Sequence, residues 1–199
     1  MLSHQVDQFA AGLLALNLSR GDRIGIWGPN SYEWVLVQWA AARAGLILVK
    51  KIKSIEVRED KSWQHIVFHL QVNINPAYKS DELCYALNLV GVKALVMAPK
   101  FRNFDLLTIL KDAAPELTSA SGTAVSGASV PSLKHVILLS SNTEDKALLC
   151  WQDVMSSSTA KLIEQVHNIQ RRIQFDEPTN IQFTSVSDAE NLYQNQIVI

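Results

Sequence analysis

The alternation of short apolar runs with helical segments constrains the fold of this chain more than any other sequence feature. Residues Arg23–Trp27 form a short strand-like run, followed by a Gly-Pro-Asn-Ser turn. Asn30, with Glu33 three residues later, predicts a capping box for the next helix. The apolar run Leu46–Val49 is typical of a strand buried on both faces. This strand-helix-strand pattern predicts two parallel strands joined by a right-handed crossover.

The same alternation continues along the chain and predicts an α/β fold, a mostly parallel sheet flanked by helices. Apolar residues recur at helical spacing from Val6 to Leu16, before the first strand. Later helices are expected at 81–90 with a cap at Ser80, from a cap at Asn103 to Ala113, and at 159–169. The later strands are expected at 93–98, 134–139 and 180–184. A Ser/Thr/Gly/Ala-rich stretch at 118–129 indicates a surface loop.

Residues Lys50 to Gln71 do not follow this alternation and are interpreted as an insertion. The segment begins with many charges and continues as the strand-like run His65–Leu70. Closing a loop of about 22 residues costs only about 2–3 kcal/mol, so one alternative is that the segment bulges out of the fold. The other is that His65–Val72 replaces Leu46–Val49 in the sheet.

Composition excludes several classes of function. Of the 199 residues, 48% are hydrophobic and the net charge is −1, which is typical of a globular domain and not of a protein that binds nucleic acid or an anionic membrane. No apolar run is long enough to predict a membrane span. The separated Cys84 and Cys150 predict free, buried thiols in a reducing compartment.

Two clusters of polar residues resemble ligand sites, but their sequence context favours another interpretation of each. His65 and His69 have helical spacing for a metal pair, but their β-rich surroundings and the lack of a third ligand favour packed or solvated side chains, so no metal site is predicted. The basic cluster at Lys50, Lys51 and Lys53 is nearly balanced by acids close by, which favours a solvated loop.

Four ordered motifs give the chain a resemblance to the AMP-forming acyl-CoA synthetases, and within them to the medium-chain fatty acid ligases of mitochondria. These motifs are Gly21-Asp22-Arg23-Ile24-Gly25-Ile26-Trp27-Gly28-Pro29-Asn30-Ser31, Ala42-Arg43-Ala44-Gly45-Leu46-Ile47-Leu48-Val49, Asn75-Pro76-Ala77-Tyr78, and Asp176-Glu177-Pro178-Thr179-Asn180-Ile181-Gln182-Phe183-Thr184-Ser185. The resemblance implies an incomplete part of the N-terminal subdomain of an adenylating enzyme. It also implies the family reaction, in which a fatty acid, ATP with Mg²⁺ and CoA give acyl-CoA, AMP and pyrophosphate through an acyl-adenylate.

The resemblance breaks off at the phosphate-binding loop. This loop has the form T-S-G-T-T-G-x-P-K-G in the family, and only Thr184 and Ser185 match it before Val186-Ser187-Asp188-Ala189 follows. Glycines are needed there because they let backbone N–H groups close on phosphate oxygens. We therefore expect Thr184 and Ser185 to be the remnant of an ATP phosphate site. We expect no catalytic residues, no tight binding of ATP, Mg²⁺ or CoA, and no adenylation by this chain alone.

The expected organisation is a partial AMP-binding domain at 1–185, interrupted by the insertion at 50–71, and a tail at 186–199 unlike the family. The departures are those of altered splicing or of a wrong gene model. The chain is accordingly a piece of a ligase, a non-catalytic isoform that binds the full-length enzyme or another partner, or an unstable product. The resemblance implies a mitochondrial location, and the lack of a visible transit peptide leaves a cytoplasmic one as the alternative.

Overall fold

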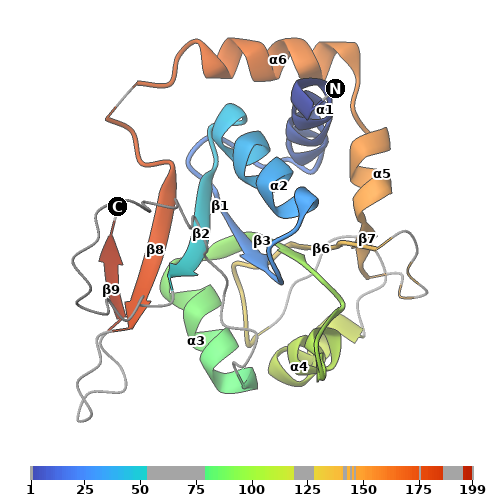
Figure 1. Cartoon of the computed structure of the whole chain (residues 1–199), viewed down its shortest axis with the longest axis vertical. Coiled ribbons are helices and arrows are strands. Elements are labelled where there is room, and N and C mark those ends of the chain that lie inside the picture. Colours follow the sequence, from blue (N-terminus) through green and yellow to red (C-terminus); the bar gives the residue numbers. More distant parts are fainter. Residues whose placement is uncertain are drawn as a thin grey trace, which may run out of the picture.

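A computed structural model describes residues 2–52, 79–118, 128–140, 143, 145, 147–174, 176–185 and 195–198. In these ranges a seven-stranded sheet is covered by helices on both faces, and two further short strands form a hairpin (Figure 1). The elements are α1 (Leu2–Ala15), β1 (Arg23–Trp27), α2 (Tyr32–Arg43), β2 (Ile47–Ile52), α3 (Ser80–Leu89), β3 (Val92–Met97), β4 (Lys100–Phe101), β5 (Phe104–Asp105), α4 (Leu106–Ala113), the 3₁₀ turn η1 (Pro115–Thr118), β6 (His135–Leu138), β7 (Leu149–Cys150), α5 (Trp151–Ser156), α6 (Ala160–Gln170), β8 (Asn180–Ser185) and β9 (Asn195–Val198).

The sheet has the strand order β7-β6-β3-β1-β2-β8-β9. All neighbours from β7 to β8 are parallel, and only β9 runs antiparallel, on the outer side of β8. The predicted α/β fold with a mostly parallel sheet is therefore confirmed. The two strands of the first predicted strand-helix-strand unit pair directly, with Ile24 opposite Leu48.

Alternating residues of the central strands supply two separate cores. Ile24 and Ile26 of β1 pack with Ala94 and Val96 of β3 under helices α1, α2, α5 and α6. Trp27 packs on the other face with the next residues of β3, under α3 and α4. Figure 1 shows the same arrangement, with α1, α2, α5 and α6 above the sheet and α3 and α4 below it. Because side chains of a strand alternate between faces, burial on both faces explains the continuous apolar runs.

Three of the predicted helix caps are displaced. Ser31, and not Asn30, caps α2 by accepting a hydrogen bond from the Trp34 amide. The helix α3 begins at Ser80 itself, after Lys79. Asp105 caps α4 by accepting from the Thr108 amide. In each case the competing residue lies within two positions, and local sequence alone does not distinguish such neighbours.

Asn103 does not cap α4 because it lies in the turn of a hairpin that sequence analysis did not predict. The hairpin pairs Phe101 with Phe104, and Arg102 in the turn has a φ of 51°. Thr159, where the last predicted helix was expected to begin, caps α6, because its hydroxyl accepts a hydrogen bond from the Leu162 amide. The elements β7, α5 and β9 were also not predicted, because strands of two to four residues and a helix of six carry little periodicity.

Strand β2 extends into the segment interpreted as an insertion. It runs to Ile52, so Lys50 and Lys51 belong to the sheet and not to a solvated loop. The alternative in which His65–Val72 replaces Leu46–Val49 is wrong, because Ile47–Ile52 lies between β1 and β8. Residues 53–78, including Lys53 and both histidines of the rejected metal pair, lie outside the described residues.

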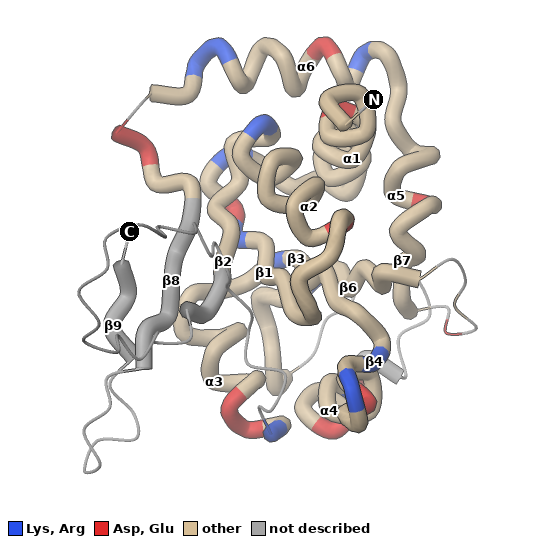
Figure 2. Tube along the Cα trace, viewed as in Figure 1, with Lys and Arg blue, Asp and Glu red and all other residues tan. Residues whose placement is uncertain are grey.

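Figure 2 shows basic and acidic residues intermixed along the helices that are described. Among those helices, none is both long enough and apolar enough to cross a bilayer.

Candidate functional site

The carboxyl edge of the sheet is the first candidate site, because open α/β sheets bind ligands there. The parallel register brings the ends of β1, β3 and β6 together, with Trp27 opposite Met97 and Met97 opposite Leu138. On the other side of β1, Ile52 at the end of β2 lies opposite Thr184 of β8. The carboxyl ends of these strands therefore lie at one edge of the sheet.

Thr184 and Ser185 are the last residues of β8 and lie at this carboxyl edge. Thr184 is paired with Ile52 of β2 on one side and with Gln196 of β9 on the other, and Ser185 is paired with Asn195. The two residues thus lie at the end of a parallel strand, where a phosphate loop would begin. Their role in binding phosphate stays a prediction, and residues 186–194 lie outside the described part of the chain.

A topological switch point falls between the parallel strands β1 and β3, because their connections leave on opposite faces of the sheet. The chain leaves β1 through α2 on one face and enters β3 from α3 on the other. The loops are tightly packed here, because a Cβ on Gly28 would lie 3.0 Å from the Cβ of Ala98 and 3.3 Å from its backbone nitrogen. A side chain at position 28 would therefore require the segment at Ala98 to move by a few tenths of an ångström.

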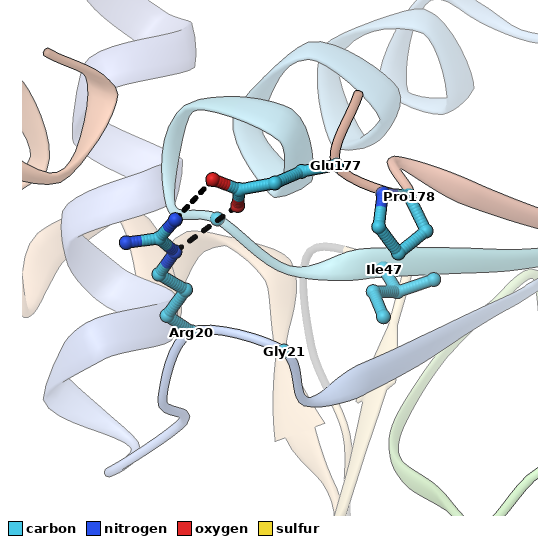
Figure 3. Close-up of a pocket in the computed structure, with 6 residues that line it drawn as sticks. Arg20, Gly21, Ile47, Glu177 and Pro178 are labelled. Atoms are coloured by element: carbon cyan, nitrogen blue, oxygen red, sulfur yellow. Dashed lines mark hydrogen bonds and ion pairs between the residues drawn. The ribbon is translucent and has the colours of Figure 1, made fainter. Parts of the chain in front are cut away.

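A pocket of about 400 Å³ lies at the opposite, amino edge of the sheet and was not predicted as a site. Its walls come from the segments that precede β1, β2 and β8 (Figure 3). The lining residues are Arg20, Gly21, Gly45, Ile47, Glu177 and Pro178. All of these residues except Arg20 belong to motifs that carry the resemblance to acyl-CoA synthetases, and this was the only sequence signal that marked them.

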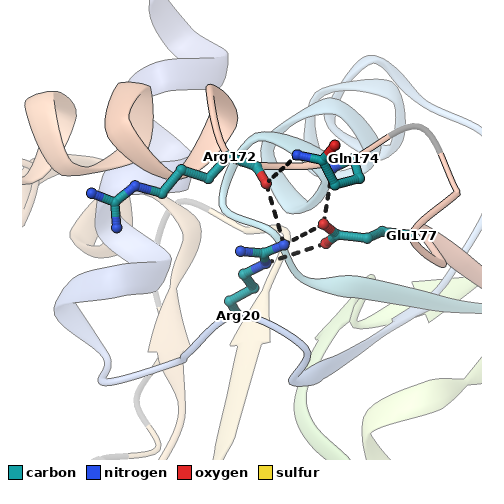
Figure 4. Close-up of polar contacts among 4 residues, drawn as sticks. All are labelled: Arg20, Arg172, Gln174 and Glu177. Carbon is teal, nitrogen blue, oxygen red and sulfur yellow. Dashed lines mark hydrogen bonds and ion pairs between the residues drawn. The ribbon is translucent and has the colours of Figure 1, made fainter.

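An ion pair between Arg20 and Glu177 closes one side of this pocket. The guanidinium binds both carboxylate oxygens, through Nη2 to Oε1 and through Nε to Oε2 at 3.2 Å. Arg20 also donates to the carbonyl of Arg172 at 3.4 Å, and Glu177 accepts from the Gln174 amide at 2.8 Å (Figure 4). The network therefore joins the turn before β1 to the turn before β8, although the two are 157 residues apart.

A second ion pair supports the same edge from within. Asp22 is buried, and its carboxylate accepts from the Ser19 amide at 2.9 Å and contacts Lys93 Nζ at 2.6 Å. Arg23 Nε donates to the carbonyl of Val90 at 2.7 Å. The charged groups of the amino edge are thus engaged in holding strands together, which favours a structural role over a catalytic one.

The pKa of Glu177 makes this contact sensitive to acid. The hydrogen bonds from Arg20 and from the Gln174 amide hold the pKa of Glu177 below its ordinary value of 4.5. A carboxyl with a lowered folded-state pKa stabilises the fold above its unfolded pKa and loses that contribution as the pH falls through the folded one.

We therefore expect Glu177→Gln to lower the melting temperature by a few degrees at most near neutral pH. The difference from the parent chain should shrink as the pH falls below the ordinary carboxyl pKa and vanish below the lowered folded-state pKa, where the carboxylate itself is protonated. Thermal unfolding followed by circular dichroism at several pH values measures both effects. Glu164→Gln, at an exposed position of α6, is the matched control and should follow the parent at each pH. A pH-independent deficit in Glu177→Gln would contradict the ion-pair interpretation.

The two thiols are unsuited to nucleophilic catalysis. Cys150 is buried, whereas Cys84 is only partly buried and donates to the Ala113 carbonyl at 2.9 Å, so the prediction of free thiols is confirmed and that of burial holds for Cys150 alone. Burial is the largest cause that raises the pKa of both thiols, with Asp81 adding to it at Cys84 and Asp153 at Cys150. Within the described residues there is also no cluster of three side chains that could bind a metal.

Comparison with known proteins connects these features to one family. Residues 1–52 match the model of the AMP-binding enzymes. The mitochondrial medium-chain acyl-CoA ligase ACSF2 of Macaca fascicularis is 38% identical over 185 residues, and the human ACSF2 is 37% identical over 184, each alignment covering 92% of this chain. The chain is a relative of the AMP-binding acyl-CoA ligases. The resemblance expected from the sequence motifs is therefore confirmed.

Solved acyl-CoA ligases share the fold. A long-chain-fatty-acid-CoA ligase of Archaeoglobus fulgidus superposes with a TM-score of 0.57 at 18% identity, over 92% of this chain. The anthranilate CoA ligase AuaEII superposes with a TM-score of 0.54 at 16% identity, over 79% of this chain. The chain spans only about a quarter of the ligases it matches, 26% of ACSF2 and 26% of the A. fulgidus enzyme. The AMP-binding match ends at Ile52, which is also the last residue of β2.

Proposed function

We propose that this chain is part of the scaffold of an acyl-CoA ligase, the part that leads into the ATP phosphate site. In the corresponding complete enzyme, a medium-chain fatty acid and ATP with Mg²⁺ would give an acyl-adenylate and pyrophosphate, and CoA would then take the acyl group. The observation that carries the proposal is the position of Thr184 and Ser185 at the carboxyl end of β8, in parallel register beside β2. A mitochondrial location is proposed from the names of the relatives.

We further propose that residues 1–199 do not catalyse adenylation by themselves. Stabilisation of the phosphate charge by oriented donors is usually the largest catalytic contribution, and a loop that supplies them needs glycines and a lysine. The segment that follows Ser185 in the printed sequence begins Val-Ser-Asp-Ala and contains neither residue up to position 199. In this proposal 1–185 is a partial AMP-binding domain, 50–71 is an insertion, and 186–199 is a tail unlike the family.

ATP–pyrophosphate exchange with medium-chain fatty acids tests both proposals. The chain 1–199 should give no exchange above background. A chimera that joins residues 1–185 to the downstream part of human ACSF2 should give measurable exchange, because the phosphate loop then follows Ser185 directly. Exchange by 1–199 alone would refute the proposed inactivity, and a folded chimera without exchange would refute the scaffold role.

A pair of threonine variants in the chimera tests the site itself. Thr184→Ala should reduce exchange at least about tenfold, because it would remove a polar group at the phosphate site. Thr179→Ala is the matched control at the opposite end of β8 and should leave exchange unchanged. Equal effects of the two substitutions would argue against a phosphate site at Thr184.

A non-catalytic function is a second proposal, in which the chain associates with the full-length ligase. The observation that favours it is a row of exposed apolar side chains on α2: Tyr32, Val35 and Trp39 are 51%, 41% and 56% exposed. Their spacing places them on one side of the helix. Co-purification of the chain with ACSF2 at a fixed stoichiometry, lost in Trp39→Gln, would support the proposal. A monodisperse monomer that does not retain ACSF2 would refute it.

A further inference from the structure

Strand β8 is the last parallel strand of the sheet, and both of its edges are paired. Its inner edge pairs with β2 from Leu48 opposite Asn180 to Ile52 opposite Thr184. Its outer edge pairs with β9 from Gln182 opposite Val198 to Ser185 opposite Asn195. Figure 1 shows β9 beside β8 at the margin of the sheet, running in the opposite direction.

The outer edge of β8 is the margin that most needs cover. Without β9, a six-residue strand would present a row of unpaired N–H and C=O groups, and such an edge pairs readily with a strand from another molecule. The opposite margin is formed by β7, which has only two residues and offers little to pair with. The two margins therefore carry very different risks of association.

The sequence of β9 suits it to cover this edge. Ile197 and Val198 are β-branched and favour extended backbone, whereas Asn195 and Gln196 are polar. The strand has only four residues, and a short strand is one of the means by which proteins limit pairing at the margin of a sheet. Replacing the exposed edge of β8 by the shorter edge of β9 thus lowers the tendency to associate.

We propose that β9 is a built-in edge strand that prevents β8 from pairing with β8 of a second copy of this chain. The same pairing engages the backbone of Thr184 and Ser185, since Gln196 and Asn195 lie directly opposite them. Residues Asn195–Val198 thereby have a role that does not depend on ligase chemistry. Loss of β9 pairing should convert the chain from a monomer into dimers or larger species.

Two double-proline variants test the proposal on the full chain. Backbone N–H groups along a strand alternate between its two edges, so Asn195 and Ile197 donate to one edge and Gln196 and Val198 to the other. Asn195→Pro/Ile197→Pro and Gln196→Pro/Val198→Pro therefore introduce the same number of prolines, but only one of the two variants removes donors to β8. Proline is tolerated where the missing N–H faces solvent at the margin of a sheet.

Hydrogen exchange of residues 182–185 and light scattering after gel filtration give the result. In the variant that removes N–H donors to β8, the amides of residues 182–185 should exchange at least about tenfold faster than in the parent chain. The molecular mass of the same variant should rise with protein concentration. The other variant should match the parent in both measurements. The proposal is overturned if the two variants behave alike, whether both resemble the parent or both are disrupted.

Discussion

Phe9→Ala is expected to lower the free energy of unfolding by about 3–5 kcal/mol. Phe9 lies on α1, and its side chain is fully buried. Its ring stacks on Trp151 of α5, with ring centroids 4.0 Å apart and an interplanar angle of 23°. Removing it would leave a cavity between α1, α5 and the sheet, and would take away one half of the aromatic pair. The melting temperature should fall by about 6–20 °C for a chain of this length.

Phe104→Ala is the matched control for the loss of an aromatic ring. Phe104 lies on β5 and is 43% exposed, so its truncation should change stability by no more than about 0.5 kcal/mol. Urea unfolding of the two variants and the parent measures the difference. If Phe9→Ala were as mild as Phe104→Ala, the packing of α1 on α5 would have to be revised.

Gly12→Val is expected to destabilise the chain by at least about 1–3 kcal/mol through overpacking. A Cβ on Gly12 would lie 2.1 Å from the carbonyl oxygen of Val154 and 2.8 Å from its Cγ1. The first contact is with backbone, so no side-chain rotation relieves it and α1 would have to move away from α5. The better helix propensity of valine over glycine, a few tenths of a kcal/mol, does not offset this.

His4→Val on the same helix separates overpacking from helix propensity. His4 is exposed, and histidine and valine have similar helix propensities, so this variant should stay within about 0.5 kcal/mol of the parent. Thermal unfolding of both valine variants gives the comparison. A Gly12→Val chain as stable as the parent would show that α1 and α5 are not in close contact.

The contact that both substitutions probe was invisible to sequence analysis. The periodicity of residues 6–16 predicted α1, with Phe9 on its apolar face. Helix α5, which covers that face, has only six residues and directly follows the two-residue β7. Such short elements acquire their structure from tertiary packing and not from local propensity.

The strand that carries Thr184 and Ser185 was predicted from the sequence, but its neighbours in the sheet were not. The motif that ends in Thr184-Ser185 predicted a strand leading to a phosphate site, and β8 has that place in the sheet. The pairing of both residues with β9 was not predicted, since nothing in Asn195–Val198 specifies its partner strand. The Arg20–Glu177 pair was also not predicted. Sequence motifs do not indicate which side chains contact each other when 157 residues separate them.

The sequence by itself determined the alternation of strands and helices, the parallel α/β class and the kinship with acyl-CoA ligases, because hydrophobic period, caps and ordered motifs are local properties. Only the tertiary structure decided which strands became neighbours: β8 beside β2, β9 on its outer edge, and the amino edge joined by Arg20 and Glu177. The physical reason is that edge pairing and ion pairs depend on backbone groups and charges that any strand or turn can offer, and only the folded chain selects among them.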